Sequence, residues 1–299
     1  MSDHNHTHDH SHTHDSAENI RIAFFLNLVF TILEIIGGFW TNSMAILSDA
    51  LHDLGDSLSL GLAWFLDDYS QKGPDKKFTF GYSRFSLLGA LLNSLILIGG
   101  SLFILSEAVP RILNPETIKP KGMLLFAIGG IIANGLAAFK VSGGESLNEK
   151  VVTWHLLEDV LGWVAVFVVS LVLVFKEIPV LDPLLSVTIT LYVLYNVINN
   201  LKEVLNVFLQ GVPEEISIEQ IEEKIANINH VQSVYHTHVW SLEGETHLLS
   251  THVVVGDNSS REEIIKVKEE IRTLMQDEDI GHTTVEVDYE SEDYKEKCN

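Results

Sequence analysis

Long apolar segments separated by short polar connectors fill the chain from about residue 20 to residue 210. Each segment approaches the ~20 residues that an α-helix needs to cross a bilayer, so the pattern predicts six transmembrane helices. The connector between the first two is very short, and we assign Gly37, Gly38 and Thr41–Ser43 to its turn, which makes these helices an antiparallel hairpin. The six predicted helices lie at about Ile20–Trp40, Met44–Leu66, Ser86–Pro110, Gly122–Lys140, Val151–Phe175 and Pro183–Leu209.

A different pattern follows Gly211 and Pro213, where charged residues become dense. Apolar residues recur at helical spacing in two segments and alternate with polar residues in three others. This α-β-β-α-β order predicts a small α+β domain whose helices cover one face of the sheet. The predicted elements are helix Ile216–Ile228 with Ser217 as its cap, strands Ser233–Leu242 and Thr246–Val255 joined at Gly244, helix Arg261–Met275 and strand Thr283–Tyr289.

Composition and charge narrow the class of protein further. The formal net charge is −22, whereas nucleic-acid binding requires a basic patch, so no nucleic-acid partner is expected. The single cysteine, Cys298, makes an intramolecular disulfide impossible. The polar N-terminus shows no cleavable signal. We expect an integral protein of a bacterial inner membrane, in contact with the lipid bilayer and with both termini in the cytoplasm.

The first eighteen residues alternate histidine with Asp, Asn, Ser and Thr and contain no core-forming residue. We expect residues 1–18 to be disordered and to gather metal through interchangeable imidazoles. A purification tag is the alternative interpretation, but tags are usually unbroken runs of histidine. The histidines concerned are His4, His6, His8, His10, His12 and His14.

Charged residues interrupt the second and fifth apolar segments at matching spacings. His52 and Asp56 are four residues apart, as are His155 and Asp159, which puts each pair on one face of its helix. An ionisable group inside a membrane helix costs at least ~2.5 kcal/mol on insertion scales, so such groups are rare and usually functional. Two imidazoles and two carboxylates are the ligand number and type that tetrahedral zinc takes, with cobalt and cadmium as related candidates.

Other polar residues near these pairs have different predicted roles. Asp49 lies one turn before Asp53, and we interpret it as a packing or gating group rather than a ligand. Asp53 and Glu158 lie beside the ligands in sequence and are expected to tune them. Asn27 in the first segment and Asn134 in the fourth are interpreted as hydrogen-bond partners or as groups along the ion pathway.

Several motifs occur in an order that resembles the cation diffusion facilitator family of divalent-metal efflux transporters. Each motif alone is weak, but the ordered set covers nearly the whole chain. The resemblance implies six spans, a metallochaperone-like cytoplasmic domain, a homodimer and metal–proton antiport. The motifs are EIIGG from Glu34, TNSMAILSDALH from Thr41 continuing to Asp56, FGYSR from Phe80, EAVPR from Glu107, HLLED from His155, HVWSL from His238 and THVVV from Thr251.

The resemblance also implies that the two His/Asp pairs form the transport site. Similar tail domains hold regulatory metal at a dimer interface, and His236, His252 and Asp288 are expected to approach one another across the predicted sheet. Ordinary polar strand positions are the alternative for these three residues. Family members often carry a histidine-rich segment between spans four and five, and here the N-terminal segment would take that role.

We therefore divide the chain into a histidine-rich tail (1–18), a transport domain (19–210), a cytoplasmic α+β domain (211–290) and a frayed end (291–299). Deprotonated ligands bind metal and protonated ligands do not, so protons can displace the ion and drive export by alternating access. Zinc is the expected metal, and no organic cofactor is expected. The alternatives are an intramembrane metallohydrolase, for which no His-Glu-x-x-His motif occurs, and a metal sensor or channel without coupled transport.

Overall fold

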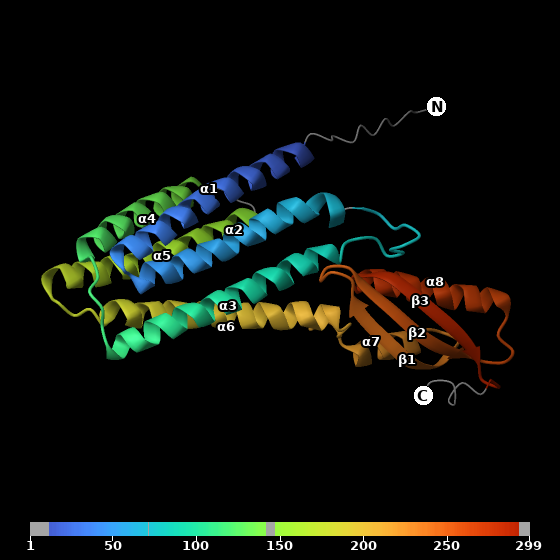
Figure 1. The fold of residues 1–299 in the computed structure, drawn as a ribbon. Coiled ribbons are helices and arrows are strands. Elements are labelled where there is room, and N and C mark those ends of the chain that lie inside the picture. The colour runs from blue at the N-terminus through green and yellow to red at the C-terminus, as the bar shows by residue number, and fades with distance from the viewer. Residues whose placement is uncertain (1–11, 71, 142–146, 293–299) are drawn as a thin grey trace, which may run out of the picture. The chain divides into compact units, whose positions relative to one another are not determined.

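The computed structural model describes residues 12–70, 72–141 and 147–292, which form six long helices followed by a small α+β domain (Figure 1). The chain divides into two compact units, residues 1–68 with 88–201 and residues 69–87 with 202–299. The first helix begins at His12, inside the segment 1–18 that is predicted to be disordered, and residues 1–11 lie outside the described part. The domain boundaries drawn from the sequence stay a prediction.

The six long helices follow the six predicted apolar segments. Within the described residues, every one of them except α2 contains a stretch long and apolar enough to cross a membrane. Helix α2 differs because Asp49, Asp53 and Asp56 interrupt its apolar sequence. The predicted helical membrane domain is confirmed. Its helices are α1 His12–Thr41, α2 Met44–Ser70, α3 Phe85–Leu113, α4 Pro120–Val141, α5 Leu147–Phe175 and α6 Leu181–Phe208.

The turn between α1 and α2 is shorter than predicted. Helix α1 continues through Gly37 and Gly38 to Thr41, and Asn42 then takes a left-handed conformation with φ 58°, which ends the helix. The prediction that both glycines belong to the turn is therefore wrong. Gly37 serves close packing instead, because a Cβ at this position would collide with the ring of Phe126 on α4.

The helix bundle is apolar on its outside and buries a set of polar side chains among apolar ones in its interior. Large apolar residues such as Phe103, Phe139 and Phe175 are exposed, as is expected for a surface that faces acyl chains. Polar groups inside a membrane bundle face one another because lipid offers them no hydrogen bonds. The buried polar side chains on α1, α2 and α6 and in the α1–α2 turn include Thr31, Glu34, Ser43, Ser48, Asp49, Asp53, Ser57, Asp182, Ser186 and Thr190.

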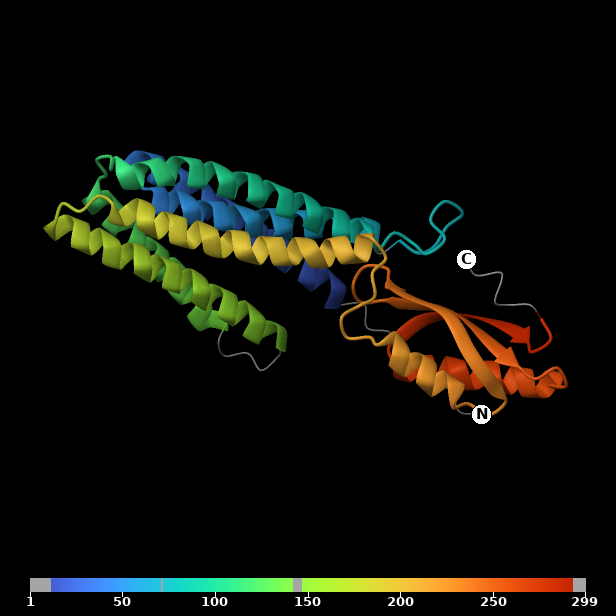
Figure 2. The ribbon, with the colours of Figure 1, turned by 90° about the horizontal axis from the view of Figure 1, so that it is seen from below.

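Two pairs of packed helices surround these buried polar residues. Helices α3 and α6 lie side by side in both views (Figures 1 and 2), where Leu97 of α3 packs with Val193 and Val197 of α6. Helices α4 and α5 share a second buried cluster that contains Ala127 and Trp163. Helix α2 contributes Ala45 and Ile46 to the second cluster, and its Asp49 and Asp53 side chains are buried inside the bundle.

The second unit carries the predicted small domain. Its sheet has the order β1-β2-β3, in which β1 runs antiparallel and β3 parallel to β2. The Ser217 hydroxyl accepts a hydrogen bond from the Gln220 backbone N–H, which confirms the predicted helix cap. The order of elements confirms the α-β-β-α-β prediction. They are α7 Ile218–Ala226, β1 Val231–Ser241, β2 His247–Val255, α8 Arg261–Asp277 and β3 Ile280–Tyr289.

Both small helices pack on the same face of this sheet. Ile225 of α7 and Ile271 of α8 join Leu249 and Val253 of β2 and Ile280 of β3 in one buried cluster. Side chains alternate between the two faces along a strand. The residues between these core positions therefore lie on the opposite face, which the two helices leave uncovered.

Candidate metal centres

The first candidate centre lies between α2 and α5 in the helix bundle. Helix α2 carries His52 and Asp56 one turn apart, and the His52 Nε2 atom lies 3.9 Å from Asp56 Oδ2. Asp159 of α5 places its Oδ1 atom 3.6 Å from the same nitrogen. The structure thus brings together three of the four predicted transport ligands. Their side chains are 26%, 30% and 11% exposed, so the group is shielded but still open to an ion.

The fourth predicted ligand, His155, lies one turn before Asp159 on α5. Its side chain falls outside the described part of the structure, so its participation stays a prediction. Ligand atoms on a tetrahedral zinc ion with bonds of ~2.0–2.1 Å are about 3.3 Å apart. The distances from His52 to Asp159 and to Asp56 are only slightly longer. Small side-chain rotations therefore suffice to bring these atoms onto one ion.

Contacts from α1 hold the ligand-bearing helix in place. The Asn27 amide donates hydrogen bonds to the Asp53 backbone carbonyl and to the Ser57 hydroxyl, both at 3.1 Å. The Thr31 hydroxyl lies 3.4 Å from the same Ser57 hydroxyl. Asn27 is therefore a hydrogen-bond partner of α2, and its place on an ion pathway stays a prediction.

Three further carboxyl groups lie near the ligands. Asp49 and Asp53 on α2 are 5% and 6% exposed, and Glu34 on α1 is fully buried. Among the described residues the Glu34 carboxyl meets no hydrogen-bonding partner other than the neighbouring carboxyl of Asp53, which is rare for a buried carboxyl. Burying several like charges together is unfavourable unless a positive charge compensates them. The interior of the bundle therefore favours cations.

Two other predicted residues lie on α4 and α5. Glu158 is exposed and bonds with the Tyr192 hydroxyl of α6. Asn134 is half-buried, and its amide nitrogen meets no acceptor among the described residues. Their predicted tuning and pathway roles stay predictions.

The sequence analysis missed a further residue, Asp182, whose only signal was an acidic group in the first turn of α6.

The second candidate centre lies on the helix-free face of the β-sheet. His252 of β2 and Glu286 and Asp288 of β3 place ligand atoms within 4.8 Å of one another. The Nδ1 atom of His252 lies 3.0 Å from Asp288 Oδ2, and its Nε2 atom lies 3.6 Å from Glu286 Oε2. The Tyr235 hydroxyl of β1 donates a 2.7 Å hydrogen bond to the same Asp288 oxygen, which orients this carboxylate.

His236 of β1 is not one of the three residues of this group, but its ring lies near that of His252. The register between β1 and β2 shifts after Tyr235, and His236 takes a left-handed conformation there with φ 53°. Its exposed ring lies 5.4 Å from the His252 ring, centroid to centroid. Glu286, which was not among the predicted ligands, occupies the third position beside His252 and Asp288. Its spacing of two residues from Asp288 on one strand was the available signal.

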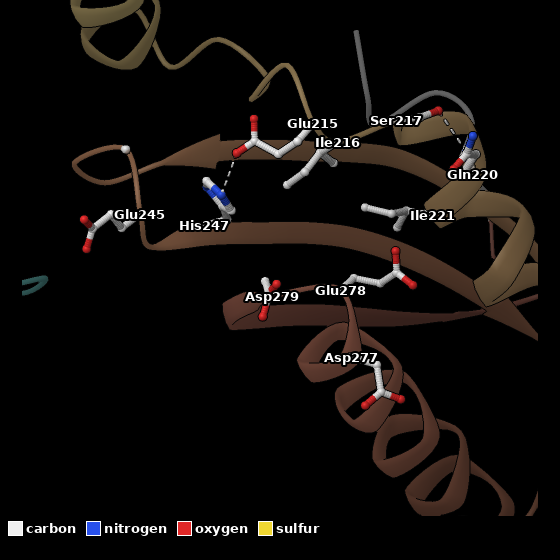
Figure 3. A pocket seen from close by; sticks show the side chains of 11 residues that line it. Glu215, Ile216, Ser217, Gln220, Ile221, Glu245, His247, Asp277, Glu278 and Asp279 are labelled. Atoms are coloured by element: carbon white, nitrogen blue, oxygen red, sulfur yellow. Dashed lines mark hydrogen bonds and ion pairs between the residues drawn. The ribbon is translucent and has the colours of Figure 1, made fainter. Parts of the chain in front are cut away.

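An acidic pocket of about 620 Å³ lies elsewhere in the same domain (Figure 3). The Nε2 atom of its largely buried His247 lies 3.2 Å from Glu215 Oε1. The carboxylates attract cations, but the described residues form no three-ligand metal group at this position. The charged and imidazole side chains that line it are Glu215, Glu245, His247, Asp277, Glu278 and Asp279.

The N-terminal histidines cannot be placed in either centre. His4, His6, His8 and His10 lie outside the described residues. His12 and His14 lie at the start of α1, and their side chains also fall outside the description. Their metal-gathering role stays a prediction.

Sequence comparison matches two successive parts of the chain to family profiles. Residues 20–209 match the profile described as the cation efflux transmembrane domain. Residues 213–290 match the profile described as the cytoplasmic domain of cation efflux proteins.

Several known proteins are similar to the chain over most of their length. A cadmium, cobalt and zinc/H(+)-K(+) antiporter of Bacillus subtilis (strain 168) is 33% identical over 91% of this chain and 89% of its own. The metal cation efflux system protein CzcD of Cupriavidus metallidurans is 34% identical over 95% of this chain and 89% of its own. The zinc transporter ZitB of Pectobacterium atrosepticum is 31% identical over 96% of this chain and 89% of its own.

Proposed function

The chain belongs to the cation efflux family, the cation diffusion facilitators, and on this premise we propose that it exports divalent metal, zinc above all, in exchange for protons. Members of this family are secondary transporters and not enzymes. The observation that carries the proposal is the approach of His52 on α2 to Asp159 on α5 inside the bundle. An imidazole and a carboxylate on separate helices form a site that helix movement can open and close.

The chemistry of the ligands provides both binding and release. A neutral imidazole and ionised carboxylates bind zinc, and two carboxylates cancel the charge of the ion, which makes it tolerable in a medium of low polarity. Protons that enter from the opposite side compete for the same atoms and displace the metal. Cobalt and cadmium suit the same mixed nitrogen and oxygen ligands, and both are named for the Bacillus subtilis relative.

The placement of the protein in the cell is also part of the proposal. An even number of spans leaves both ends of the chain on one side, which we assign to the cytoplasm of a bacterial inner membrane. The similar proteins named above are bacterial. The match of residues 213–290 to the cytoplasmic domain of the family supports a homodimer in which these domains take part. The N-terminal histidines would gather metal on the same side.

A regulatory zinc ion in the cytoplasmic domain is the second part of the proposal. One imidazole and two carboxylates within 4.8 Å of one another suit zinc, and the Tyr235 hydroxyl supplies the outer hydrogen bond that such sites use. His252, Glu286 and Asp288 would hold the ion, with His236 next to them. A bound divalent ion would neutralise the acidic charge between two such domains and so favour their contact.

Zinc uptake into sealed proteoliposomes under an imposed pH gradient tests the main proposal. We expect uptake that depends on the gradient and that is abolished by His52→Ala. Zinc flux that ignores the gradient would identify a channel, and zinc binding without flux would identify a sensor. Hydrolysis of a membrane peptide without zinc flux would identify a metallohydrolase. Each of these three results would overturn the proposed antiport.

A further inference from the structure

The N-terminus of α2 is capped by a carboxylate from α6. Asp182, in the first turn of α6, accepts hydrogen bonds from the Ser43 hydroxyl at 2.5 Å and from the backbone N–H groups of Met44 at 2.7 Å and Ala45 at 3.3 Å. The Asp182 side chain is only 1% exposed, and Ser43 is fully buried. Helix α2 therefore starts on a fixed charge that belongs to a distant part of the chain.

This contact satisfies a specific physical need of the helix. The first N–H groups of any helix have no partner within the helix, and leaving them without an acceptor inside a membrane protein is strongly unfavourable. Ser43 alone satisfies one of them, because its hydroxyl accepts from the Ile46 N–H at 3.2 Å. Asp182 accepts from the two N–H groups before Ile46, those of Met44 and Ala45, and from the Ser43 hydroxyl, and its negative charge also suits the positive end of the helix dipole.

The face of α6 that carries Asp182 also contacts α2 at a second point, closer to the candidate transport ligands. Ser186 and Thr190 follow Asp182 at intervals of four residues, which places all three on one helix face. The Ser48 hydroxyl of α2 lies 2.5 Å from the Ser186 hydroxyl and 3.1 Å from that of Thr190. Ser48 is one turn before His52. Hydrogen bonds from α6 therefore fix α2 from its first residue to the turn that precedes the ligand.

We propose that Asp182 is a positioning residue for the metal-transport site, acting through the N-terminus of α2 to set where His52 and Asp56 stand relative to Asp159. This inference rests on the proposed transport function. From Ser43 to His52 the helix rises about 13.5 Å, and a rigid helix transmits a shift at its start to its ligands. Zinc demands ligand distances within ~0.2 Å, so a small axial shift or rotation of α2 weakens the site.

The test uses the full-length protein in proteoliposomes and compares four variants: Asp182→Ala, Asp182→Asn, Ser43→Ala and Ser101→Ala. Ser101 is the matched control, because it is fully buried on α3, which carries none of the proposed ligands. We expect Asp182→Ala to raise the KM for zinc about tenfold or more while Vmax stays within about twofold, since misplacement by 1 Å can cost ~10²-fold. Asp182→Asn keeps an acceptor oxygen and is expected to raise KM about threefold.

A purely structural role would give a different pattern. It would lower the thermal stability and the active fraction, and hence Vmax, without changing KM. An unchanged KM in Asp182→Asn and Ser43→Ala, with wild-type transport intact, would overturn the inference. These two variants also decide the question should Asp182→Ala fail to fold.

A separate measurement distinguishes failure of this inference from failure of the proposed function. Zinc binding to the same detergent-solubilised variants, titrated calorimetrically, reports binding without transport, and the part of the signal that is lost in His52→Ala belongs to the transport site. If the wild type binds zinc but does not transport it, the antiport proposal fails while the binding constants still test Asp182. We expect weaker zinc binding in Asp182→Ala than in Ser101→Ala, and equal affinities would overturn the positioning role.

Discussion

The Nε2 atom of His52 lies 3.6 Å from the Oδ1 atom of Asp159, although the two residues belong to helices that are far apart in the chain. Asp56, one turn further along α2, lies 3.9 Å from the same nitrogen. An imidazole between two carboxylates keeps the three groups together before metal arrives. Zinc then replaces contacts that already exist, which reduces the reorganisation that binding requires.

Loss of either member of this pair is expected to abolish metal transport. His52→Ala and Asp159→Asn each remove one ligand of the proposed site, and we expect zinc uptake by proteoliposomes to fall by about a hundredfold or more. Ser170→Ala is the control, because Ser170 is buried on α5 and its hydroxyl bonds only to the Phe167 carbonyl of its own helix among the contacts described. Transport that survives in both ligand variants would contradict the assignment.

The cytoplasmic group is expected to bind a zinc ion that transport itself does not require. His252→Ala should remove one zinc ion per chain from the full-length protein, as measured by equilibrium dialysis, because the other two ligands are carboxylates that bind zinc weakly alone. Uptake at saturating zinc should persist. His230→Ala is the matched control, since His230 is a half-exposed histidine of the same domain, paired with Glu263.

An unchanged number of bound ions in His252→Ala would exclude this site. Asp288→Asn provides a second test, because it removes the carboxylate that Tyr235 orients while it leaves the histidine in place. We expect this variant to weaken zinc binding about tenfold or more, as changes around a metal site commonly do.

Two adjacent glycines on α4 are expected to respond oppositely to the same substitution. A Cβ at Gly130 would collide with the indole of Trp163 on α5, whereas a Cβ at Gly129 meets no atom within 4 Å among the described residues. Gly130→Ala should therefore push α5 away and lower the melting temperature in detergent, by overpacking that typically costs about 1–3 kcal/mol.

Trp163 lies one turn after Asp159, so Gly130→Ala should also impair zinc uptake. Gly129→Ala should leave both properties close to the wild type. Equal melting temperatures for the two variants would show that the α4–α5 contact is looser than its geometry indicates.

The cap of α8 gives a pH dependence with a definite sign. The Glu263 carboxylate accepts hydrogen bonds from the Ser260 backbone N–H at 2.7 Å and from its hydroxyl at 2.9 Å, and these bonds lower the pKa of Glu263 below its ordinary value of 4.5. The unfolded chain therefore takes up this proton first as pH falls. The contribution of the cap to stability is present above the ordinary pKa and is lost as pH falls through the lower folded value.

We expect amide hydrogen exchange in α8 to accelerate over this window in the wild type, beyond the intrinsic change with pH. In Glu263→Gln the first turn should already be less protected at neutral pH, and this part of the pH dependence should be absent. Glu262→Gln, one position earlier, removes the same charge without removing the cap. An identical pH response in all three proteins would contradict the role of Glu263.

Local sequence determined the elements of this protein, because hydrophobic periodicity and capping act over a few residues. The apolar segments became the long helices, Ser217 became a cap and the alternation from Thr246 to Val255 became β2. The spacing of His52 and Asp56 likewise decided that both lie on one face of α2. Gly37 and Gly38 lie in α1 and not in the turn that the sequence predicted for them, since glycine serves turns and close helix packing equally well.

Tertiary structure alone decided which of these elements meet. Helix α5 brings Asp159 to His52, and α6 brings Asp182 to the start of α2. Both contacts depend on packing between distant segments, which no local pattern encodes. The bulge that holds His236 apart while Glu286 joins His252 is likewise a matter of strand register. The sequence therefore identified the residue types that bind metal, and the family resemblance implied which of them share a site, whereas the contacts of Asp182 and of Glu286 emerged only once the helices and strands were placed in space.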